Sequence, residues 1–222
     1  MLANNLANVT TAGYKLDREF YGIFSGEAGG DLTGSTLPVI ERPWIDFSQG
    51  LLQETGNTLD LALSGRGFFS VKGPSGVLYT RNGSFRVDKN RNLVTAEGYA
   101  VEAVGGRTIT AQNLGNLEIG RDGVVKEDGQ ELGRLALVEL KDPGLLTKQG
   151  ASYFRATDLA AVAPATEAEV HQGKLEASNV SSAESAARLV GVMRQFEVLQ
   201  KAISLAGDMG RKAIEEVAKV GP

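Results

Sequence analysis

The chain has 222 residues, of which 42% are hydrophobic, so it is long enough to bury a substantial core. Its 23 Lys and Arg residues against 27 Asp and Glu residues give a formal net charge of −4, which excludes the basic surface of a nucleic-acid-binding protein. The lack of cysteine excludes disulfides and thiolate metal sites.

The N-terminal fifteen residues are rich in asparagine. They lack the basic-then-apolar order of a cleaved secretory signal. The chain also contains no run of about 18 apolar residues that could cross a bilayer. We therefore expect no nucleic-acid partner and no membrane insertion, and any export to proceed without a cleaved signal peptide.

Residues 22–36 come next and contain Gly22, Gly26, Gly29, Gly30 and Gly34 among serine and threonine. Their apolar content is too low for a folded unit of their own. This composition predicts a connector.

Residues 56–140 predict a series of short strands. Apolar or β-branched runs occupy residues 59–63, 68–71, 77–80, 85–87, 93–95, 99–101, 117–119 and 135–140. Turn signals such as Asn82-Gly83, Asp122-Gly123 and Asp128-Gly129 separate them. This alternation is typical of a compact antiparallel sheet or a small barrel. Residues 143–172 carry few signals, and a strand pair and a returning loop both remain open there.

From Ser178 onward the apolar residues follow a seven-residue period. Two sets recur at that interval with an offset of three: Leu189, Phe196, Ile203, Gly210 and Val217, and Val192, Leu199, Ala206, Ala213 and Val220. This pattern predicts a long coiled-coil helix, and Ser181 with Glu184 has the form of a capping box at its start. Its apolar seam needs a covering surface. The β body and another helix are the alternatives, and the strict period favours another helix.

Three ordered motifs closely resemble those of the bacterial flagellar rod and hook axial proteins. Residues 4–15, Asn-Asn-Leu-Ala-Asn-Val-Thr-Thr-Ala-Gly-Tyr-Lys, resemble the N-terminal signature of that family. Residues 56–85, with Gly65-Arg66-Gly67-Phe68-Phe69 and Tyr79-Thr80-Arg81-Asn82-Gly83, resemble its β-domain sequence. Residues 175–180, Leu-Glu-Ala-Ser-Asn-Val, resemble the start of its C-terminal helix. Residues 193–197, Met-Arg-Gln-Phe-Glu, are more similar to the proximal-rod branch of the family than to the distal-rod branch.

The resemblance implies a mainly β protein with terminal helices. We expect a central glycine-rich antiparallel β domain, a long C-terminal coiled-coil helix and a short N-terminal helical remnant, because relatives carry a further helical segment before the signature. The expected divisions are an N-terminal axial segment and connector at residues 1–36, a β-rich outer domain at 37–172 and a C-terminal coiled-coil helix at 173–222.

The resemblance also implies a structural subunit of the flagellar basal-body rod in the periplasm, polymerising helically through coiled-coil helices as drive shaft and export channel. Its implied partners are other rod and hook axial proteins and copies of itself, with no catalytic residue, cofactor or metal. The expected packing residues are Asn4, Asn5, Leu6, Asn8, Leu189, Val192, Phe196, Leu199 and Ile203. For the asparagines, bridges between subunits and an ordinary surface turn are both open.

Enzymatic sites have weaker support. His171 is the only histidine, which excludes a site with two imidazoles, and its polar surroundings indicate a solvated loop. Gly65-Arg66-Gly67 lacks the third glycine of a dinucleotide loop, and Asp88–Asn92 lacks the glycine of a calcium loop, so we interpret both as turns.

Two functions of other classes remain as alternatives. One is a glycan- or peptidoglycan-binding β module, for which Trp44 is the single tryptophan available. The other is a hydrolase of the cell wall, which is disfavoured because the sequence has no recognisable pair of catalytic acids.

Overall fold

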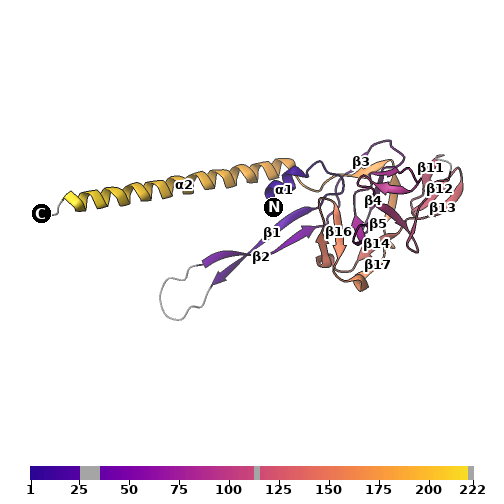
Figure 1. Ribbon diagram of the computed structural model, residues 1–222, viewed down its shortest axis with the longest axis horizontal. Coiled ribbons are helices and arrows are strands. Elements are labelled where there is room, and N and C mark those ends of the chain that lie inside the picture. The colour runs from indigo at the N-terminus through magenta and orange to yellow at the C-terminus, as the bar shows by residue number, and fades with distance from the viewer. Residues whose placement is uncertain (26–35, 113–115, 220–222) are drawn as a thin grey trace. The chain divides into compact units, whose positions relative to one another are not determined.

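The computed structural model describes residues 1–25, 36–112 and 116–219, with side chains for 1–18, 44–112, 116–212 and 214. It divides into two compact units (Figure 1). The β-rich unit runs to Val180, and the second unit holds the chain from Ser181 together with Leu2. Every strand pairing among the described residues is antiparallel.

The first two strands form a separate two-stranded sheet. They are β1 (Leu16–Ser25) and β2 (Thr36–Asp46), with a bulge between Phe20 and Tyr21. The prediction of a connector over residues 22–36 is therefore wrong for its ends, because residues 22–25 continue β1 and Thr36 begins β2. Residues 26–35 lie outside the described part of the chain. Aromatic and β-branched residues favour extended structure, and here they outweigh the local glycine content.

The main sheet of the β-rich unit has ten strands. Its order is β15-β16-β6-β5-β9-β8-β7, with β10 paired to β9 and with β14 paired to both β5 and β17. The strands are β5 (Phe68–Gly73), β6 (Gly76–Thr80), β7 (Phe85–Val87), β8 (Leu93–Thr95), β9 (Ala100–Ala103), β10 (Arg107–Thr108), β14 (Leu137–Leu140), β15 (Leu146–Lys148), β16 (Tyr153–Ala156) and β17 (Val162–Pro164).

Three smaller sheets complete this unit. They consist of β11 (Leu117–Ile119), β12 (Val124–Glu127) and β13 (Gln130–Arg134); of β18 (Glu169–Gln172) and β4 (Leu61–Ser64); and of β19 (Lys174–Glu176) and β3 (Leu52–Glu54). Short 3-10 turns span Pro143–Leu145 and Leu159–Ala161. Each strand predicted from sequence overlaps an observed strand, and residues 143–172 contain paired strands instead of a simple loop.

Two hydrophobic clusters lie on opposite sides of β5. Neighbouring residues of a strand point to opposite faces, so Phe69 enters the larger cluster, with Leu61, Val71 and Val101, while Phe68 enters the smaller one. In the smaller cluster Phe47, which follows β2, packs edge-on against Phe68 with 5.5 Å between ring centroids. The β1–β2 sheet is thus attached at its base to the core of the β-rich unit.

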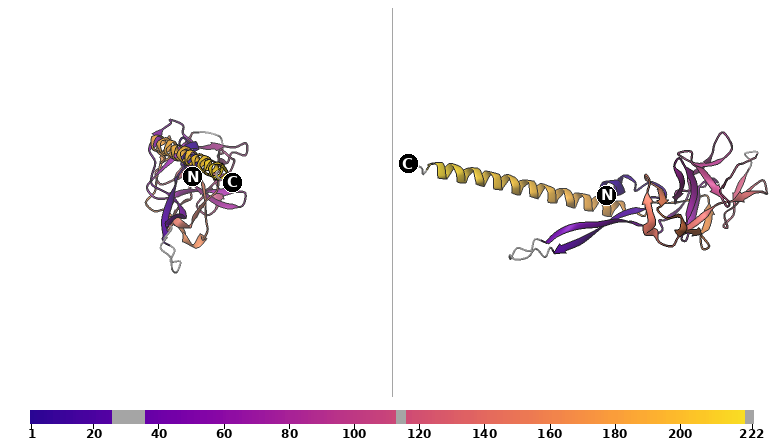
Figure 2. Two further views of the ribbon diagram at one scale, coloured as in Figure 1. Left: turned by 90° about the vertical axis from the view of Figure 1, so that its left-hand side faces the viewer. Right: turned by 60° about the horizontal axis from the view of Figure 1, so that its bottom comes forward.

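Two helices flank the strands in the chain. The first, α1 (Leu2–Ala7), has six residues, and α2 (Ser182–Lys219) has 38 and continues without a break through Gly207 and Gly210 (Figure 2). The predicted cap is present in part: the Glu184 backbone N–H donates to Ser181 Oγ at 3.3 Å. The Glu184 carboxylate pairs with Arg188 at 2.8 Å. None of the helices in the described ranges combines the length and apolar character needed to span a bilayer.

Candidate functional site

Three residues from the three sequence motifs meet in a buried ionic cluster, which we call the motif junction: Lys15, Arg81 and Glu176. Lys15 Nζ lies 2.6 Å from Glu176 Oε1, and Arg81 Nη1 lies 3.1 Å from Glu176 Oε2. The Lys15 and Glu176 side chains are fully buried, and Arg81 is 4% exposed. All three residues lie within the sequence motifs, but no sequence pattern predicted that they touch.

Backbone groups bind further polar atoms of the motif junction, although Arg81 Nε has no hydrogen-bond acceptor. Lys15 Nζ donates to the Ser48 carbonyl at 2.7 Å, Arg81 Nη2 donates to the Gly65 carbonyl at 2.6 Å, and the Gly50 N–H donates to Glu176 Oε1 at 2.9 Å. Burial lowers the pKa of Lys15 and of Arg81, and the Glu176 carboxylate opposes that shift in both. Such a cluster is stable only when every charge keeps its partner.

The backbones of the three motifs also touch directly. The Gly13 N–H donates to the Glu176 carbonyl at 2.8 Å. A Cβ atom at Gly13 would stand 2.2 Å from the Asn82 nitrogen, and Gly13 has a φ of +68°. Only glycine combines this conformation with so close an approach. The N-terminal signature therefore lies against both other motifs.

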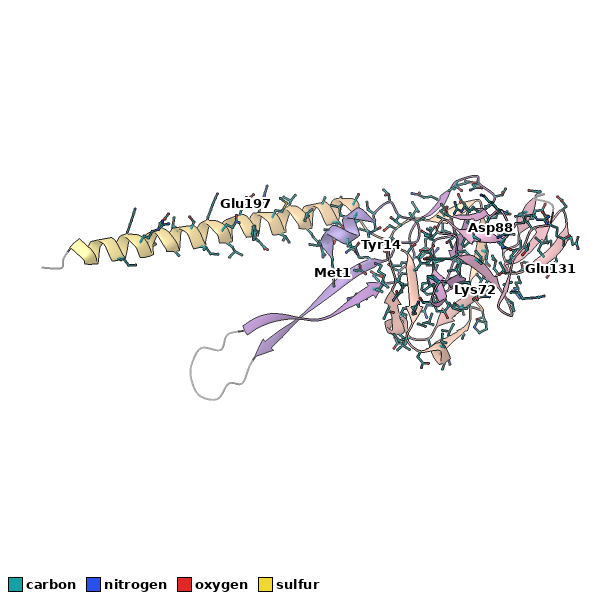
Figure 3. The ribbon with its side chains drawn as sticks, in the orientation of Figure 1. Met1, Tyr14, Lys72, Asp88, Glu131 and Glu197 are labelled. Atoms are coloured by element: carbon teal, nitrogen blue, oxygen red, sulfur yellow. The ribbon has the colours of Figure 1, made fainter. Side chains whose placement is uncertain are left out.

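Asn5, one of the predicted packing residues, is used within the chain (Tyr14 is labelled in Figure 3). It is 2% exposed. Tyr14 Oη donates to Asn5 Oδ1 at 2.9 Å, Asn5 Nδ2 donates to the Asp17 carbonyl at 2.8 Å, and the Asp17 N–H donates to Asn5 Oδ1 at 3.0 Å. Asn5 thus ties α1 to the start of β1. Burial, and then the nearby Asp17 carboxylate, raise the pKa of Tyr14.

The other predicted N-terminal residues are more accessible. Asn8 Nδ2 donates to the Asn4 carbonyl at 2.9 Å and to Asn4 Oδ1 at 3.0 Å, and Thr11 Oγ1 donates to Asn8 Oδ1 at 3.2 Å. Asn4 is exposed, while Leu6 and Asn8 are half-buried. The hydrogen bonds of Asn8 are therefore those of a local turn. Asn4 remains accessible to another molecule.

Asn179 links the two segments that lead to the terminal helices. Its Oδ1 accepts from the Leu16 N–H at 2.8 Å, and its Nδ2 donates to the Asp46 carbonyl at 2.7 Å and to the Ser48 carbonyl at 3.1 Å. The sequence did not predict this role of Asn179. The only indication was that Asn179 lies in the third motif, just before the predicted helix.

The predicted seam of α2 is exposed. Leu189 is half-buried, whereas Val192 is 49%, Phe196 60%, Leu199 61% and Ile203 73% exposed. At about 100° per residue, these five residues fall on one face. The residues of the predicted seam are therefore accessible to another molecule along most of its length.

A second apolar stripe on α2 was not predicted. Val198, Leu205 and Met209 are exposed by 65%, 65% and 66%, and helical geometry places them about 130° around the axis from the seam. Charged residues such as Glu197 and Lys201 lie in the remaining sector, which also holds the exposed Val190 (Glu197 is labelled in Figure 3). The seven-residue pattern did not predict this stripe, because its residues lie outside the a and d positions.

The other sequence candidates are structural. His171 lies in β18 opposite Ala62 and is half-buried, so its interpretation as a solvated loop residue is wrong. Asp88–Asn92 forms the turn between β7 and β8, where the Asn92 N–H donates to Asp88 Oδ1 at 2.8 Å. Within the described residues, no group of three or more potential metal ligands is present.

Comparison with known proteins gives the same family along the chain. Residues 62–127 match the family described as flagellar hook protein FlgE/F/G D1 domain, and residues 171–216 match the flagellar basal body rod FlgEFG protein C-terminal family. The flagellar basal-body rod protein FlgF of Caulobacter vibrioides is 34% identical, over 99% of this chain and 91% of that protein. FlgG of Borreliella burgdorferi is 33% identical, over 94% of this chain and 88% of that protein, and FlgG of Bacillus subtilis is 29% identical, over 94% and 89%. The chain belongs to the flagellar basal-body rod protein family.

Proposed function

We propose that the chain is a structural rod subunit that polymerises helically through its terminal helices. In this proposal it joins other rod and hook axial proteins and copies of itself in the periplasm, where the polymer is the drive shaft and encloses the export channel. The subunit works by binding its neighbours and catalyses no reaction. It reaches the rod without a cleaved signal peptide.

The exposed apolar surface of α2 is the observation that carries this proposal. Phe196, Leu199 and Ile203 are each more than half exposed to water. An exposed apolar surface of this extent is typical of a protein–protein interface. Burying these side chains against a neighbouring helix stabilises an assembly by about 1.5–3 kcal/mol for each large residue.

The two stripes support packing in a layer of helices. A two-stranded coiled coil covers one narrow seam, which would leave Val198, Leu205 and Met209 in water. Two neighbours on different sides of α2 would cover both stripes and leave Glu197 and Lys201 in the polar sector. Contacts between unlike faces produce an open helical polymer when the rotation between subunits does not close a ring.

The motif junction supports a role in transmitting force. It holds Gly13 against Glu176, and Asn179 against Leu16, so the chain leading out of α1 and the chain leading into α2 are fixed together on the β-rich unit. Buried side chains that are joined by ion pairs and hydrogen bonds resist displacement better than a flexible linker does. Torque on either terminal segment would therefore reach a rigid body.

An assembly experiment tests the proposal. The full chain, alone and mixed with purified FlgG-type rod protein, is followed by sedimentation and electron microscopy. We expect helical tubes or co-assembly, and we expect Phe196→Asp to abolish them by placing a charge in the seam. Ser204→Asp adds the same charge next to Ile203 but on the polar sector, and it should leave assembly intact. Equal assembly of both variants, or monomers under every condition, would contradict the proposal.

A further inference from the structure

A groove of about 750 Å³ lies beside the base of the β1–β2 sheet. We call it the basic aromatic groove and define it by Trp44, Phe47, Arg66, Phe68, Arg81 and Lys141. Its lining comes from the end of β2, the turn before β5, the end of β6 and the region after β14. None of the contacts described above fills the opening of this groove.

The apolar part of the groove is partly open to solvent. Trp44 is 48% exposed, with the Arg18 guanidinium 5.6 Å from its ring centre. Phe47 and Phe68 form the floor, where their rings meet edge to face. An accessible tryptophan beside a packed aromatic floor suits an apolar side chain of a short extended segment.

The polar part of the groove offers hydrogen-bond donors. Arg66 and Lys141 are exposed, and neither forms an ion pair with a described side chain. Among the described lining residues, Glu139 is the one acid. Arg81 is buried, yet its Nε has no hydrogen-bond acceptor. That atom has almost no accessible surface, so an occupant would meet the exposed Arg66 and Lys141 instead. These two cations suit an occupant that brings carboxylates.

One segment of this chain has that chemistry. Residues 26–35 read Gly-Glu-Ala-Gly-Gly-Asp-Leu-Thr-Gly-Ser. They contain the acids Glu27 and Asp31, the apolar Leu32 and no basic residue. Two carboxylates would face Arg66 and Lys141, and one leucine would face Trp44.

The strand register separates this segment from the groove of its own chain. Arg18 pairs with Trp44, and Ser25 pairs with Thr36. The seven residues from position 18 to 25 span about 23 Å at ~3.3 Å per residue. A ten-residue segment that leaves and returns can reach back by about five residues, or ~17 Å. The groove of another molecule is therefore the accessible one.

We propose that the basic aromatic groove binds residues 26–35 of a second copy of this chain. This inference rests on the proposed function, because the groove and the segment are different surfaces, and such pairing links subunits in an open series when they polymerise helically. The contact adds a second connection between subunits, independent of α2. Charge complementarity selects the occupant, and Leu32 fixes its register against the aromatic floor.

Trp44 provides the readout, because it is the only tryptophan of the chain. A peptide of residues 25–36 contains no aromatic residue, so its binding to the full chain is measured directly by tryptophan fluorescence. We expect a saturable change in emission. A peptide with Glu27→Lys and Asp31→Lys should bind at least ten-fold more weakly. The chain with Arg66→Glu and Lys141→Glu should lose the original peptide and bind the reversed one.

Several outcomes would overturn the inference: no saturable change at millimolar peptide, equal binding of both peptides, or a response to soluble peptidoglycan fragments in place of the peptide. Far-ultraviolet circular dichroism confirms that the charge-reversed chain is folded. If that chain is unfolded, the comparison of the two peptides on the unchanged chain still decides the question.

Engineered cysteines test the contact between full chains, since the chain has none of its own. An Asp31→Cys chain mixed with a Lys141→Cys chain should form an intermolecular disulfide, and the same chain mixed with Ser75→Cys, in the turn between β5 and β6, should not. Equal crosslinking in both mixtures would contradict the contact. Neither the fluorescence nor the crosslinking measurement requires assembly through α2. A negative result in these two experiments would therefore leave the proposal of assembly through α2 unaffected.

Discussion

Lys15 and Glu176 are 161 positions apart in the chain, and their side chains form an ion pair of 2.6 Å with no exposed surface. Arg81 completes the same cluster from the middle of the sequence. The three motifs that identify the family therefore share one structural task, which is to join the two terminal segments to the β-rich unit.

We expect Glu176→Gln to lower the free energy of unfolding by about 3–5 kcal/mol, because it leaves two cations buried without a counter-charge. Urea denaturation of the full chain measures the change. Glu167→Gln, at an exposed position, is the matched control and should change stability by less than about 0.5 kcal/mol. A similar small effect at both positions would show that the motif junction is not a determinant of stability.

We expect Gly13→Ala to cost roughly 2–5 kcal/mol, since it combines a strained positive φ with a clash against Asn82. Gly56 has a φ of +72° but nothing within 4 Å of a Cβ atom. Gly56→Ala should therefore cost only the conformational part, about 1–2 kcal/mol. Thermal unfolding of the two variants separates the cost of backbone strain from the cost of the clash with Asn82. Equal losses of stability in both variants would contradict the contact between the first two motifs.

Asn5→Ala should destabilise the attachment of α1 by about 1–3 kcal/mol, because it removes the hydrogen bonds of Asn5 to the Asp17 backbone and leaves Tyr14 Oη with only its 3.3 Å bond to Asp17 Oδ2. Hydrogen exchange should accelerate in residues 2–17 more than in the sheet. Asn4→Ala, at an exposed position, should change exchange little. If Asn4→Ala nevertheless prevents assembly, that result would support its predicted role in subunit packing.

Tyr14→Phe should change the alkaline limit of stability. The folded-state pKa of Tyr14 lies above its ordinary value of 10.0 because of burial and the Asp17 carboxylate. A raised pKa contributes stability that is complete below pH 10 and is lost as the pH rises through the folded value. The variant should therefore be less stable at pH 8 but should lose stability less steeply above pH 10. Denaturation midpoints between pH 8 and 11 measure both effects, and parallel curves would contradict this linkage.

Local patterns were sufficient to predict much of the β-rich unit and the start of the long helix. Asn82-Gly83 separates β6 from β7, and Ser181 caps α2 as its sequence context indicated. The β1–β2 sheet was missed because composition over residues 22–36 gave glycine more weight than the strand-forming residues beside it. Strands of three residues, such as β15 and β17, are too short to establish a period.

The motif junction could not be predicted by the same means. Lys15, Arg81 and Glu176 are brought together by tertiary structure, and no local period relates residues at such separations. The motifs showed that these positions matter to the family but not that they touch. For α2 the heptad pattern predicted one interacting face, while Val198, Leu205 and Met209 became informative only when their exposure was known.

The accessibility of α2 before and after assembly tests the central claim most directly. Single cysteines at Ile203 in the seam, Val198 in the second stripe and Lys201 in the polar sector are labelled with a thiol reagent in the isolated chain and in rods. We expect all three to react rapidly in the isolated chain. In rods, Ile203→Cys and Val198→Cys should be protected at least ten-fold while Lys201→Cys stays reactive. Equal labelling of Ile203→Cys in rods and in the isolated chain would contradict the claim that neighbouring subunits cover the exposed apolar surface of α2.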